Sequence, residues 1–461
     1  MKYFLSIAVL ILICLQAFSQ QEKPNIILIN IDDMGWRDLG FMGSDFYETP
    51  IIDSLSRSGM VFTQGYASSA NCAPSRASMI TGLWNPRHGI YTVGTSERGN
   101  SRDRKIIPTE NKTTLGKEYQ IIPQTLKKSG YKTIHAGKWH LSDSPLDYGF
   151  DVNIGGGHNG HPSSYYPPYG NVNLEGENEK YLTDAIMLKT LKEMDKTEGP
   201  FFLYYSPYAV HTPIMPVKSL LSKYEQKSSK IGQSNAEYAT MVENLDRNIG
   251  LLINTLKRNH QLKNTILIFV SDNGGLKGIT DQQPLRAGKG SYYEGGIRVP
   301  FFFIWEGKIK PGTNKQTPIT NLDIFPTILE AAEIKEEFPL DGESLIPLLT
   351  QNKELPDRPL FWHFPIYLES YKYGQNETRD SLFRTRPGTA MRFGKWKLHY
   401  FFEENEIELY NLENDLSEKI DLSGQLPEKR EELLGMMKDW WIYTSAPIPQ
   451  TPNPAYIKLD E

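Results

Sequence analysis

Cys72 is the one cysteine of the chain outside the N-terminal hydrophobic segment, which contains Cys14. It lies in the stretch Asn71-Cys72-Ala73-Pro74-Ser75-Arg76. Exported proteins usually pair their cysteines as disulfides, and a single thiol has no partner for this. Cys72 is therefore either an incidental thiol or a side chain that is used chemically.

Two pairs of oxygen-bearing side chains follow apolar runs of the chain: Asp32 with Asp33 after 25–31, and Asp272 with Asn273 after 265–270. Adjacent carboxylates repel each other unless a cation compensates their charge. A set made only of oxygen ligands suits calcium or magnesium better than zinc. Each pair alone is more often a turn. Together, at the ends of two predicted strands, they favour a metal site.

Cationic and titratable residues recur at similar places: Lys138 and His140 after 132–135, His211 after 201–205, and Lys289 in the Gly-rich stretch before 300–304. A single histidine is more often structural than catalytic, and a loop lysine is usually solvated. Their recurrence after predicted strands favours a binding site for an anionic ester. Cations would hold its oxygens, and an acid would protonate the leaving alcohol.

The elements that must position these residues alternate along the chain. Five short apolar runs are typical of strands buried on both faces of a sheet: 25–31, 132–135, 201–205, 265–270 and 300–304. Helix-compatible stretches lie between or after them: 122–129, 183–194, 236–258 and 322–332. This alternation predicts an α/β fold with a large mixed, mostly parallel sheet sandwiched by helices.

After about residue 349 the pattern changes. Short strands near 389–400 and 407–411 and a helix over 427–441 predict a smaller C-terminal α+β subdomain, followed by an extended Pro-rich tail. We therefore expect a catalytic domain over residues 20–350. A subdomain with a small antiparallel sheet and a helix is expected over residues 351–461.

Residues 1–19 have the pattern of a secretory signal peptide, with Lys2 before an apolar run and a small-residue cleavage site at 17–19. The run is too short for a confident membrane span. We expect an exported protein, periplasmic or secreted, without stable membrane insertion. The formal net charge of -5 argues against a general nucleic-acid surface.

The chain resembles a type I sulfatase of the alkaline-phosphatase superfamily. The likeness covers most of the sequence and rests on stretches in family order: 25–35, 49–53, the C-x-P-S-R motif at Cys72, 137–140, 211–213, 272–275, 289–300, 394–397 and 408–412. In this family a maturation enzyme converts the motif cysteine to formylglycine, whose hydrate attacks sulfate esters. The resemblance also implies an alkaline-phosphatase-like fold.

The resemblance implies a role for each matching residue. Asp32, Asp33, Asp272 and Asn273 would bind one calcium ion together with the modified Cys72. Arg76 would hold the aldehyde hydrate, and Pro74 with Arg76 would be recognised by the formylglycine-generating enzyme. Lys138 and Lys289 would hold sulfate oxygens, His140 would assist the hydrate, and His211 would protonate the leaving oxygen.

An aldehyde hydrate suits this reaction because it has two hydroxyls. One attacks sulfur, with its charge favoured by the metal and Arg76. Deprotonation of the second, with His140 as candidate base, expels sulfate and restores the aldehyde.

Aromatic and histidine-rich segments are candidates for contacting the group that carries the sulfate. His161 ends the stretch 155–161, before Tyr165, Tyr166 and Tyr169, and His363 lies in 361–364. Such side chains suit sugar faces and hydroxyls. They are equally consistent with a packed aromatic loop. We expect a sulfated polysaccharide or oligosaccharide in preference to a small aryl sulfate.

Two other functions are compatible with parts of the sequence. A phosphonate or phosphodiester hydrolase of the same superfamily could also use formylglycine. An inactive glycan-binding relative would be expected to lack residues such as Cys72, Arg76, His140 or His211, and all four are present.

Overall fold

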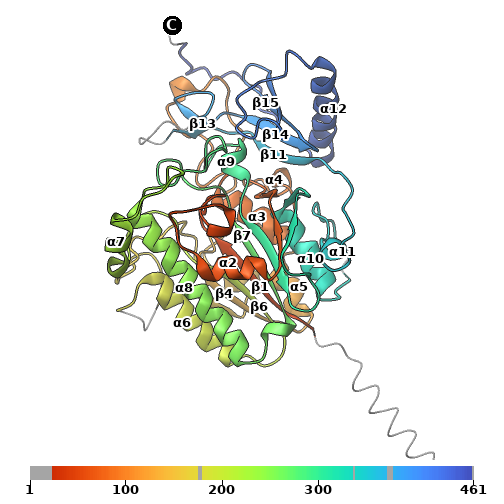
Figure 1. Ribbon diagram of the computed structural model, residues 1–461. Coiled ribbons are helices and arrows are strands. Elements are labelled where there is room, and N and C mark those ends of the chain that lie inside the picture. Colours follow the sequence, from red (N-terminus) through yellow and green to blue (C-terminus); the bar gives the residue numbers. More distant parts are fainter. Residues whose placement is uncertain (1–22, 175–178, 336–337, 371–376, 459–461) are drawn as a thin grey trace, which may run out of the picture.

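The computed structural model describes residues 23–174, 179–335, 338–370 and 377–458. Its centre is an eight-stranded sheet in the order β5-β4-β6-β1-β7-β8-β2-β9 (Figure 1). The strands are β5 (Val152–Ile154), β4 (Lys132–Gly137), β6 (Phe201–Ser206), β1 (Asn25–Ile31), β7 (Thr265–Ser271), β8 (Phe301–Trp305), β2 (Met60–Phe62) and β9 (Thr313–Lys315). The first five run parallel, and β8 is antiparallel to both of its neighbours.

The central strand β1 is apolar without interruption because it is covered on both faces. Ile27 and Ile29 join one hydrophobic cluster, and Ile26 and Leu28 join another. The first cluster includes residues of α2 (Pro50–Arg57), α6 (Leu182–Asp195), α7 (Lys218–Glu225) and α8 (Ala236–Arg258). The second includes residues of α3 (Cys72–Thr81), α5 (Ile122–Lys128), α10 (Ile324–Ala331) and α11 (Ile346–Gln351). Successive side chains of a strand point to opposite faces of the sheet, so each face is covered by its own set of helices. The fold therefore has three layers, with the sheet between two layers of helices.

A smaller antiparallel sheet forms the C-terminal part, drawn in blue in Figure 1. Its order is β11 (Leu360–Phe364), β14 (Gly388–Phe393), β15 (Trp396–Phe401) and β16 (Glu406–Asn411). Helix α12 (Pro427–Thr444) packs on it through Leu433, Met437 and Trp440. Shorter elements complete the fold: α4 (Asn85–His88), α9 (Glu294–Ile297), and the strand pairs β3 (Gly65–Tyr66) with β10 (Ile319–Thr320) and β12 (Leu368–Glu369) with β13 (Phe383–Thr385).

The predicted fold class is confirmed, including the mixed character of the large sheet and the C-terminal sheet. All five predicted strands are present, within two residues of their expected bounds. The predicted stretch 389–400 is two strands, because Gly394 has a left-handed φ of 56° and turns the chain between them. The predicted signal peptide lies outside the described residues.

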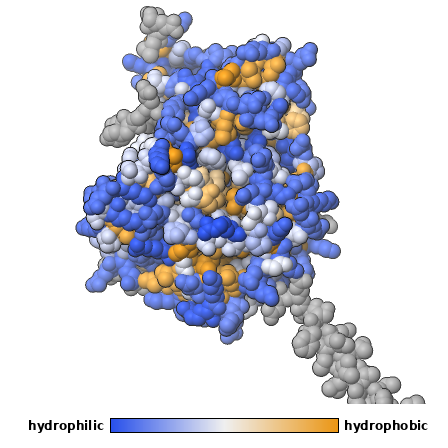
Figure 2. All heavy atoms as spheres, in the orientation of Figure 1, coloured by the Kyte–Doolittle hydropathy of each residue, from blue (hydrophilic) through white to orange (hydrophobic). Residues whose placement is uncertain are grey.

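Within the part of the chain that the structure describes, no helix combines the length and apolar character needed to cross a bilayer. The face shown in Figure 2 is mostly hydrophilic, with hydrophobic side chains gathered in separate small patches.

A buried ionic network joins the C-terminal sheet to the loop before β8. Lys397 of β15 lies between Glu294 of α9 and Glu418, at 2.9 and 3.0 Å, and all three side chains are fully buried. Glu294 also accepts a hydrogen bond from the Tyr66 hydroxyl at 2.7 Å. Burial acts to raise the pKa of Glu294, but Lys397 and neighbouring arginines outweigh it and hold the pKa at about 2.

Lys397→Met should destabilise the fold by about 3–5 kcal/mol, because it leaves two buried carboxylates without their shared cation. The measurement is the free energy of unfolding by chemical denaturation at neutral pH. The matched control is Lys395→Met in the same hairpin. Lys395 is half-exposed and its Glu413 partner is 3.4 Å away, so the expected change is at most about 1 kcal/mol. Equal effects of the two substitutions would contradict the role given to Lys397.

Candidate active site

The residues singled out for chemistry converge at one edge of the large sheet. Strands β4, β6, β1 and β7 are neighbours and run parallel, so their carboxyl ends meet there. Each of the four strands leads into predicted site residues: Lys138 and His140 after β4, His211 after β6, Asp32 and Asp33 after β1, and Asp272 and Asn273 after β7. This is where open α/β sheets place ligands.

Cys72 is the first residue of α3, and its thiol lies against the two carboxylates that follow β1. Its Sγ is 3.4 Å from Asp32 Oδ1 and 3.6 Å from Asp33 Oδ1. Asp32, Asp33, Cys72 and His211 each bring a potential ligand atom within 4.8 Å of the others. Every residue of α3 is buried, so the sulfur has a defined place in the protein interior.

Two lysines neutralise these carboxylates. Lys138 Nζ is 2.9 and 2.8 Å from the two carboxylate oxygens of Asp32. Lys289 Nζ is 2.7 Å from Asp33 Oδ2 and 3.0 Å from His211 Nε2. Two cations from distant parts of the chain therefore lie beside the Cys72 thiol.

Arg76, one helical turn after Cys72, is held on three sides. Its Nε donates to Asp272 Oδ2 at 2.8 Å, and its Nη1 donates to Lys138 O and to Ser206 Oγ. Its Nη2 is buried and has no hydrogen-bond partner among the described residues. The sequence reasoning missed Ser206, although a hydroxyl residue that ends an otherwise apolar run was the available signal.

The three aspartates differ in their electrostatics. Burial acts to raise the pKa of Asp32 and Asp33, but Lys138 and Lys289, with help from His211, outweigh it and hold both pKa values below the usual range. Burial raises the pKa of Asp272, with the charge of Asp32 adding to it, although Arg76 opposes the shift. The charged form of Asp272 is thus incompletely stabilised by the protein, and a cation bound beside it would favour that form.

Burial also sets the state of the thiol and of the two histidines. It raises the pKa of the Cys72 thiol, which keeps the sulfur protonated at neutral pH. Burial and the nearby Lys289 lower the pKa of His211 to about 4. Burial, with Lys138 and Arg76, also holds the pKa of His140 well below its usual value. Both imidazoles are therefore neutral at pH 7.

The tautomer of His211 follows from its backbone contact. Its Nδ1 lies 2.8 Å from Thr212 O, which only accepts hydrogen bonds, so Nδ1 carries the proton. Nε2 therefore carries no proton, and it lies 3.0 Å from Lys289 Nζ and 3.5 Å from Asp33 Oδ2. His140 has its Nδ1 buried, with no partner among the described residues.

Two of the site residues have left-handed backbones that are unusual outside glycine: Asp33 with φ of 58° and His140 with φ of 63°. Such conformations cost about 1–3 kcal/mol each and are concentrated at functional sites. The chain turns sharply before Lys138 as well. Gly137 has a φ of 104°, and a Cβ there would lie 2.0 Å from Ser206 O, so only glycine fits.

The residues present fit a hard cation. Asn273 donates its Nδ2 to Asp33 Oδ1 at 2.8 Å, while its Oδ1 is buried without a partner among the described residues. Asp33 N donates to Asp272 Oδ1 at 3.2 Å, which draws the second acidic pair against the first. Carboxylate and amide oxygens on a buried cluster are a ligand set for calcium or magnesium.

His161 lies over the site, and the tyrosines after it do not. Its ring stacks on that of His211 with centroids 5.9 Å apart and planes within 5°. Tyr165, Tyr166 and Tyr169 each donate their hydroxyl to backbone carbonyls. The tyrosines therefore belong to a packed loop, and His161 is the exposed side chain that this loop presents beside His211.

The prediction that His363 contacts the substrate is wrong. The ring is fully buried in β11, and its two nitrogens lie 2.8 Å from Thr389 Oγ1 and 3.0 Å from Pro447 O. Tyr91 and Trp440 pack against it. His363 is thus a hydrogen-bonded core residue of the C-terminal sheet.

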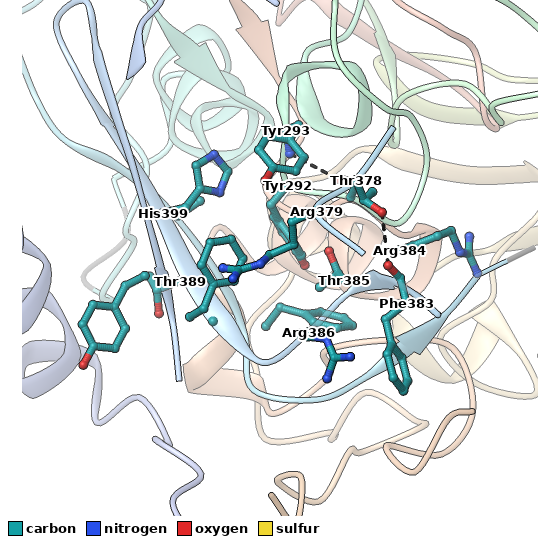
Figure 3. Close-up of a pocket in the computed structure, with 16 residues that line it drawn as sticks. Tyr292, Tyr293, Thr378, Arg379, Phe383, Arg384, Thr385, Arg386, Thr389 and His399 are labelled. Carbon is teal, nitrogen blue, oxygen red and sulfur yellow. Dashed lines mark hydrogen bonds between the residues drawn. The ribbon is translucent and has the colours of Figure 1, made fainter. Parts of the chain in front are cut away.

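A cavity between the C-terminal sheet and the loop after Lys289 is lined by aromatic and arginine side chains, including Tyr292, Phe401 and Arg379 (Figure 3). Two of its arginines are committed to carboxylates, Arg379 to Glu406 and Arg386 to Glu403. None of the residues around Cys72 lines it. We therefore assign the chemistry to the Cys72 cluster.

The cluster is equipped to act on an anionic ester. Two lysines and an arginine pair with the two carboxylates that contact the Cys72 sulfur. Neutral histidines are available to move protons, and acidic residues can hold a cation. Cationic groups fixed in a site shielded from water stabilise charge that develops during group transfer.

Comparisons with known proteins agree with this arrangement. The family model described as Sulfatase matches residues 24–334, and that described as N-sulphoglucosamine sulphohydrolase, C-terminal, matches residues 288–439. A sulfatase of Formosa agariphila is 32% identical, over 92% of this chain and 90% of its own length. Human N-acetylgalactosamine-6-sulfatase is 30% identical over 77% of this chain and 71% of its own.

A solved structure of Ps i-CgsB in complex with k-i-k-neocarrahexaose has a TM-score of 0.74 and 31% identity, covering 91% of this chain and 93% of its own. The likeness thus extends through both the large sheet and the C-terminal part.

Proposed function

The chain belongs to the sulfatase family and is a sulfuric ester hydrolase, and we propose that it desulfates a polysaccharide or oligosaccharide using formylglycine at position 72 and one calcium ion. The observation that carries this proposal is the position of Cys72. The cysteine of a C-x-P-S-R motif begins a buried helix, with its Sγ 3.4 and 3.6 Å from two carboxylates that are themselves paired with lysines.

Formylglycine supplies the nucleophilic oxygen when its hydrate forms, and a second hydroxyl through which sulfate is later released. Arg76 is placed to hold that hydrate, since its Nη2 is buried, makes no hydrogen bond among the described residues and lies 3.6 Å from Asp32 Oδ1 beside the Cys72 sulfur. His140, neutral and with a buried Nδ1 lacking such a partner, is the base for the second hydroxyl. Lys138 and Lys289 hold the sulfate oxygens and offset their charge.

His211 protonates the oxygen of the departing alcohol. Because its Nδ1 proton is committed to Thr212 O, Nε2 is the atom that first takes up a proton and then delivers it to the leaving oxygen. Lys289 lies 3.0 Å from that atom, so the group that holds sulfate and the group that completes the reaction are neighbours. His161, stacked on His211, is placed to contact the sugar that carries the ester.

Calcium would be held by Asp32, Asp33, Asp272, Asn273 and the modified residue 72, where it neutralises carboxylates and polarises facing oxygens. The ion would share the charge of Asp32 and Asp33, with which Lys138 and Lys289 pair in this structure, and the two lysines would then also contact the substrate. The buried Asn273 Oδ1 supports this assignment.

Removal of calcium with EDTA should lower desulfation at least ~100-fold, since the cation contributes several kcal/mol of charge stabilisation. It should also lower Tm, because a ligand that binds only the folded chain stabilises it. Both effects should reverse on addition of calcium in excess of EDTA. Activity and Tm that are unaffected by complete removal of divalent metals would contradict the assignment.

We further propose that residues 1–19 direct export to the periplasm or beyond, and that a formylglycine-generating enzyme modifies Cys72. Residues 20–350 would then form the catalytic domain and 351–461 the C-terminal subdomain. The intact mass of the purified protein tests both modifications at once. It should match a chain without the signal and with an aldehyde in place of the thiol.

The sulfated-sugar substrate is supported by two relatives. The human relative is named for an N-acetylgalactosamine sulfate, and the structure at 31% identity contains a neocarrahexaose. Release of sulfate from a panel of sulfated oligosaccharides, with aryl sulfates and phosphonate and phosphate esters alongside, tests this proposal. Activity on aryl sulfates alone would reject the polysaccharide substrate. Preference for phosphonates or phosphodiesters would favour the alternative hydrolase. Calcium-independent sugar binding without sulfate release would indicate an inactive glycan-binding protein.

A further inference from the structure

His211 lies in a segment without helix or strand, residues 208–216, which we call the His211 segment. One residue of the segment is fixed to the end of β1, because Val210 N donates to Asp32 O at 3.0 Å. The imidazole must nevertheless keep a defined position for its Nε2 to reach a leaving oxygen. An irregular segment needs contacts from elsewhere to provide that precision.

Three tyrosine hydroxyls from one neighbouring region donate to carbonyls of the His211 segment. Tyr165 donates to Tyr208 O at 2.6 Å and His211 O at 2.8 Å. Tyr181 donates to Met215 O at 2.8 Å, and Tyr166 donates to Pro216 O at 2.8 Å. The carbonyls thus held span the segment from its first residue to its last.

The three tyrosines also support one another. The rings of Tyr165 and Tyr181 stack with centroids 5.4 Å apart, and Tyr166 meets Tyr181 edge to face at 5.3 Å. Tyr165 is fully buried, and its backbone carbonyl accepts a hydrogen bond from Leu182 N at 2.8 Å. Its hydroxyl therefore has little freedom except toward the two carbonyls it contacts.

We propose that Tyr165, supported by Tyr166 and Tyr181, is a positioning residue for His211. The proposal rests on the proposed role of His211 as proton donor. The loop that provides Tyr165 also carries His161, whose ring stacks on His211. One loop therefore presents a side chain to the substrate and holds the proton donor in place.

Tyr165→Phe tests this role because it removes one oxygen and leaves the ring. The hydroxyl proton is shared between the carbonyls of Tyr208 and His211, so its loss lets the segment shift. A displacement of about 1 Å at the reacting groups costs on the order of 100-fold in rate. We expect kcat on a sulfated oligosaccharide to fall about 10- to 100-fold with little change in KM. Hydrolysis of nitrophenyl sulfate, whose leaving group needs no proton, should change less than about 3-fold.

The matched control is Tyr205→Phe. Tyr205 is fully buried in β6, and its hydroxyl has no hydrogen-bond partner among the described residues. This variant should keep wild-type kinetics on both substrates. If Tyr165→Phe does not fold, as judged by its thermal unfolding, Tyr181→Phe replaces it, with a smaller loss of the same selectivity expected.

Equal losses on both substrates, or no loss on either, would overturn the positioning role. A folded wild-type chain with formylglycine that hydrolyses neither substrate would instead reject the proposed function. The two failures are therefore distinguishable.

Discussion

Cys72→Ser should produce a folded protein whose desulfation activity is at least ~10⁴-fold below that of the wild type. Serine is close in size to cysteine and retains a group able to contact Asp32 and Asp33, so the fold should persist. A serine hydroxyl, however, has no route to an aldehyde when the maturation enzyme accepts only cysteine. It would also lack the second hydroxyl through which sulfate leaves.

The measurement combines sulfate release with intact mass and thermal unfolding. The matched control is wild-type chain made without the maturation enzyme, which should keep its thiol, unfold at a similar temperature and be equally inactive. Full activity in a preparation whose mass shows an unmodified thiol would refute the formylglycine proposal.

His211→Gln should have the second largest effect, and that effect should depend on the leaving group. Loss of a general acid, the role proposed for His211, typically costs about 10²- to 10⁴-fold, and we expect this range for sugar sulfates, whose alcohols leave poorly. Nitrophenyl sulfate should be affected far less. His260→Gln is the control, because His260 is exposed beyond the end of α8 and should be kinetically silent.

The pH dependence carries the same information. Burial and Lys289 lower the pKa of His211 to about 4 in the free protein, so the ring is neutral at pH 7. Bound sulfate brings negative charge next to the ring and raises its pKa, since an opposite charge favours the protonated form. The kcat of the wild type should therefore fall as the pH rises through the raised pKa of His211 in the substrate complex. His211→Gln should lose this decrease at high pH. An unchanged decrease in the variant would assign the proton to another group.

The sequence was most informative where physical chemistry leaves few choices. Asn25–Ile31 and Thr265–Ser271 are apolar throughout because both faces of these strands are covered. The polar residues at their ends therefore had to lie at one edge of the sheet, which is where Asp32 and Asp272 are found. The C-x-P-S-R motif around Cys72 predicted from the sequence alone that this cysteine has a chemical role.

The rest depended on tertiary contacts. Helix α3 has no polar face because all of it is buried, so periodicity carried no signal for it. His363 was misinterpreted because a buried histidine with two hydrogen-bond partners and an exposed ligand contact have the same sequence signature. The pairing of Lys289 with Asp33 joins residues more than two hundred positions apart and needs the complete fold.

The burial of α3 has a consequence for when the enzyme is made active. Every side chain from Cys72 to Thr81 is enclosed, and a second protein has no access to the sulfur after the sheet has closed around it. The proposed oxidation of the thiol would then have to happen on a nascent, still unfolded chain, because folding would make the thiol inaccessible. A cell that synthesises this chain faster than it is oxidised would accumulate molecules that are correctly folded and permanently inert. The specific activity of a preparation would thus depend on how fast the chain was synthesised relative to its oxidation.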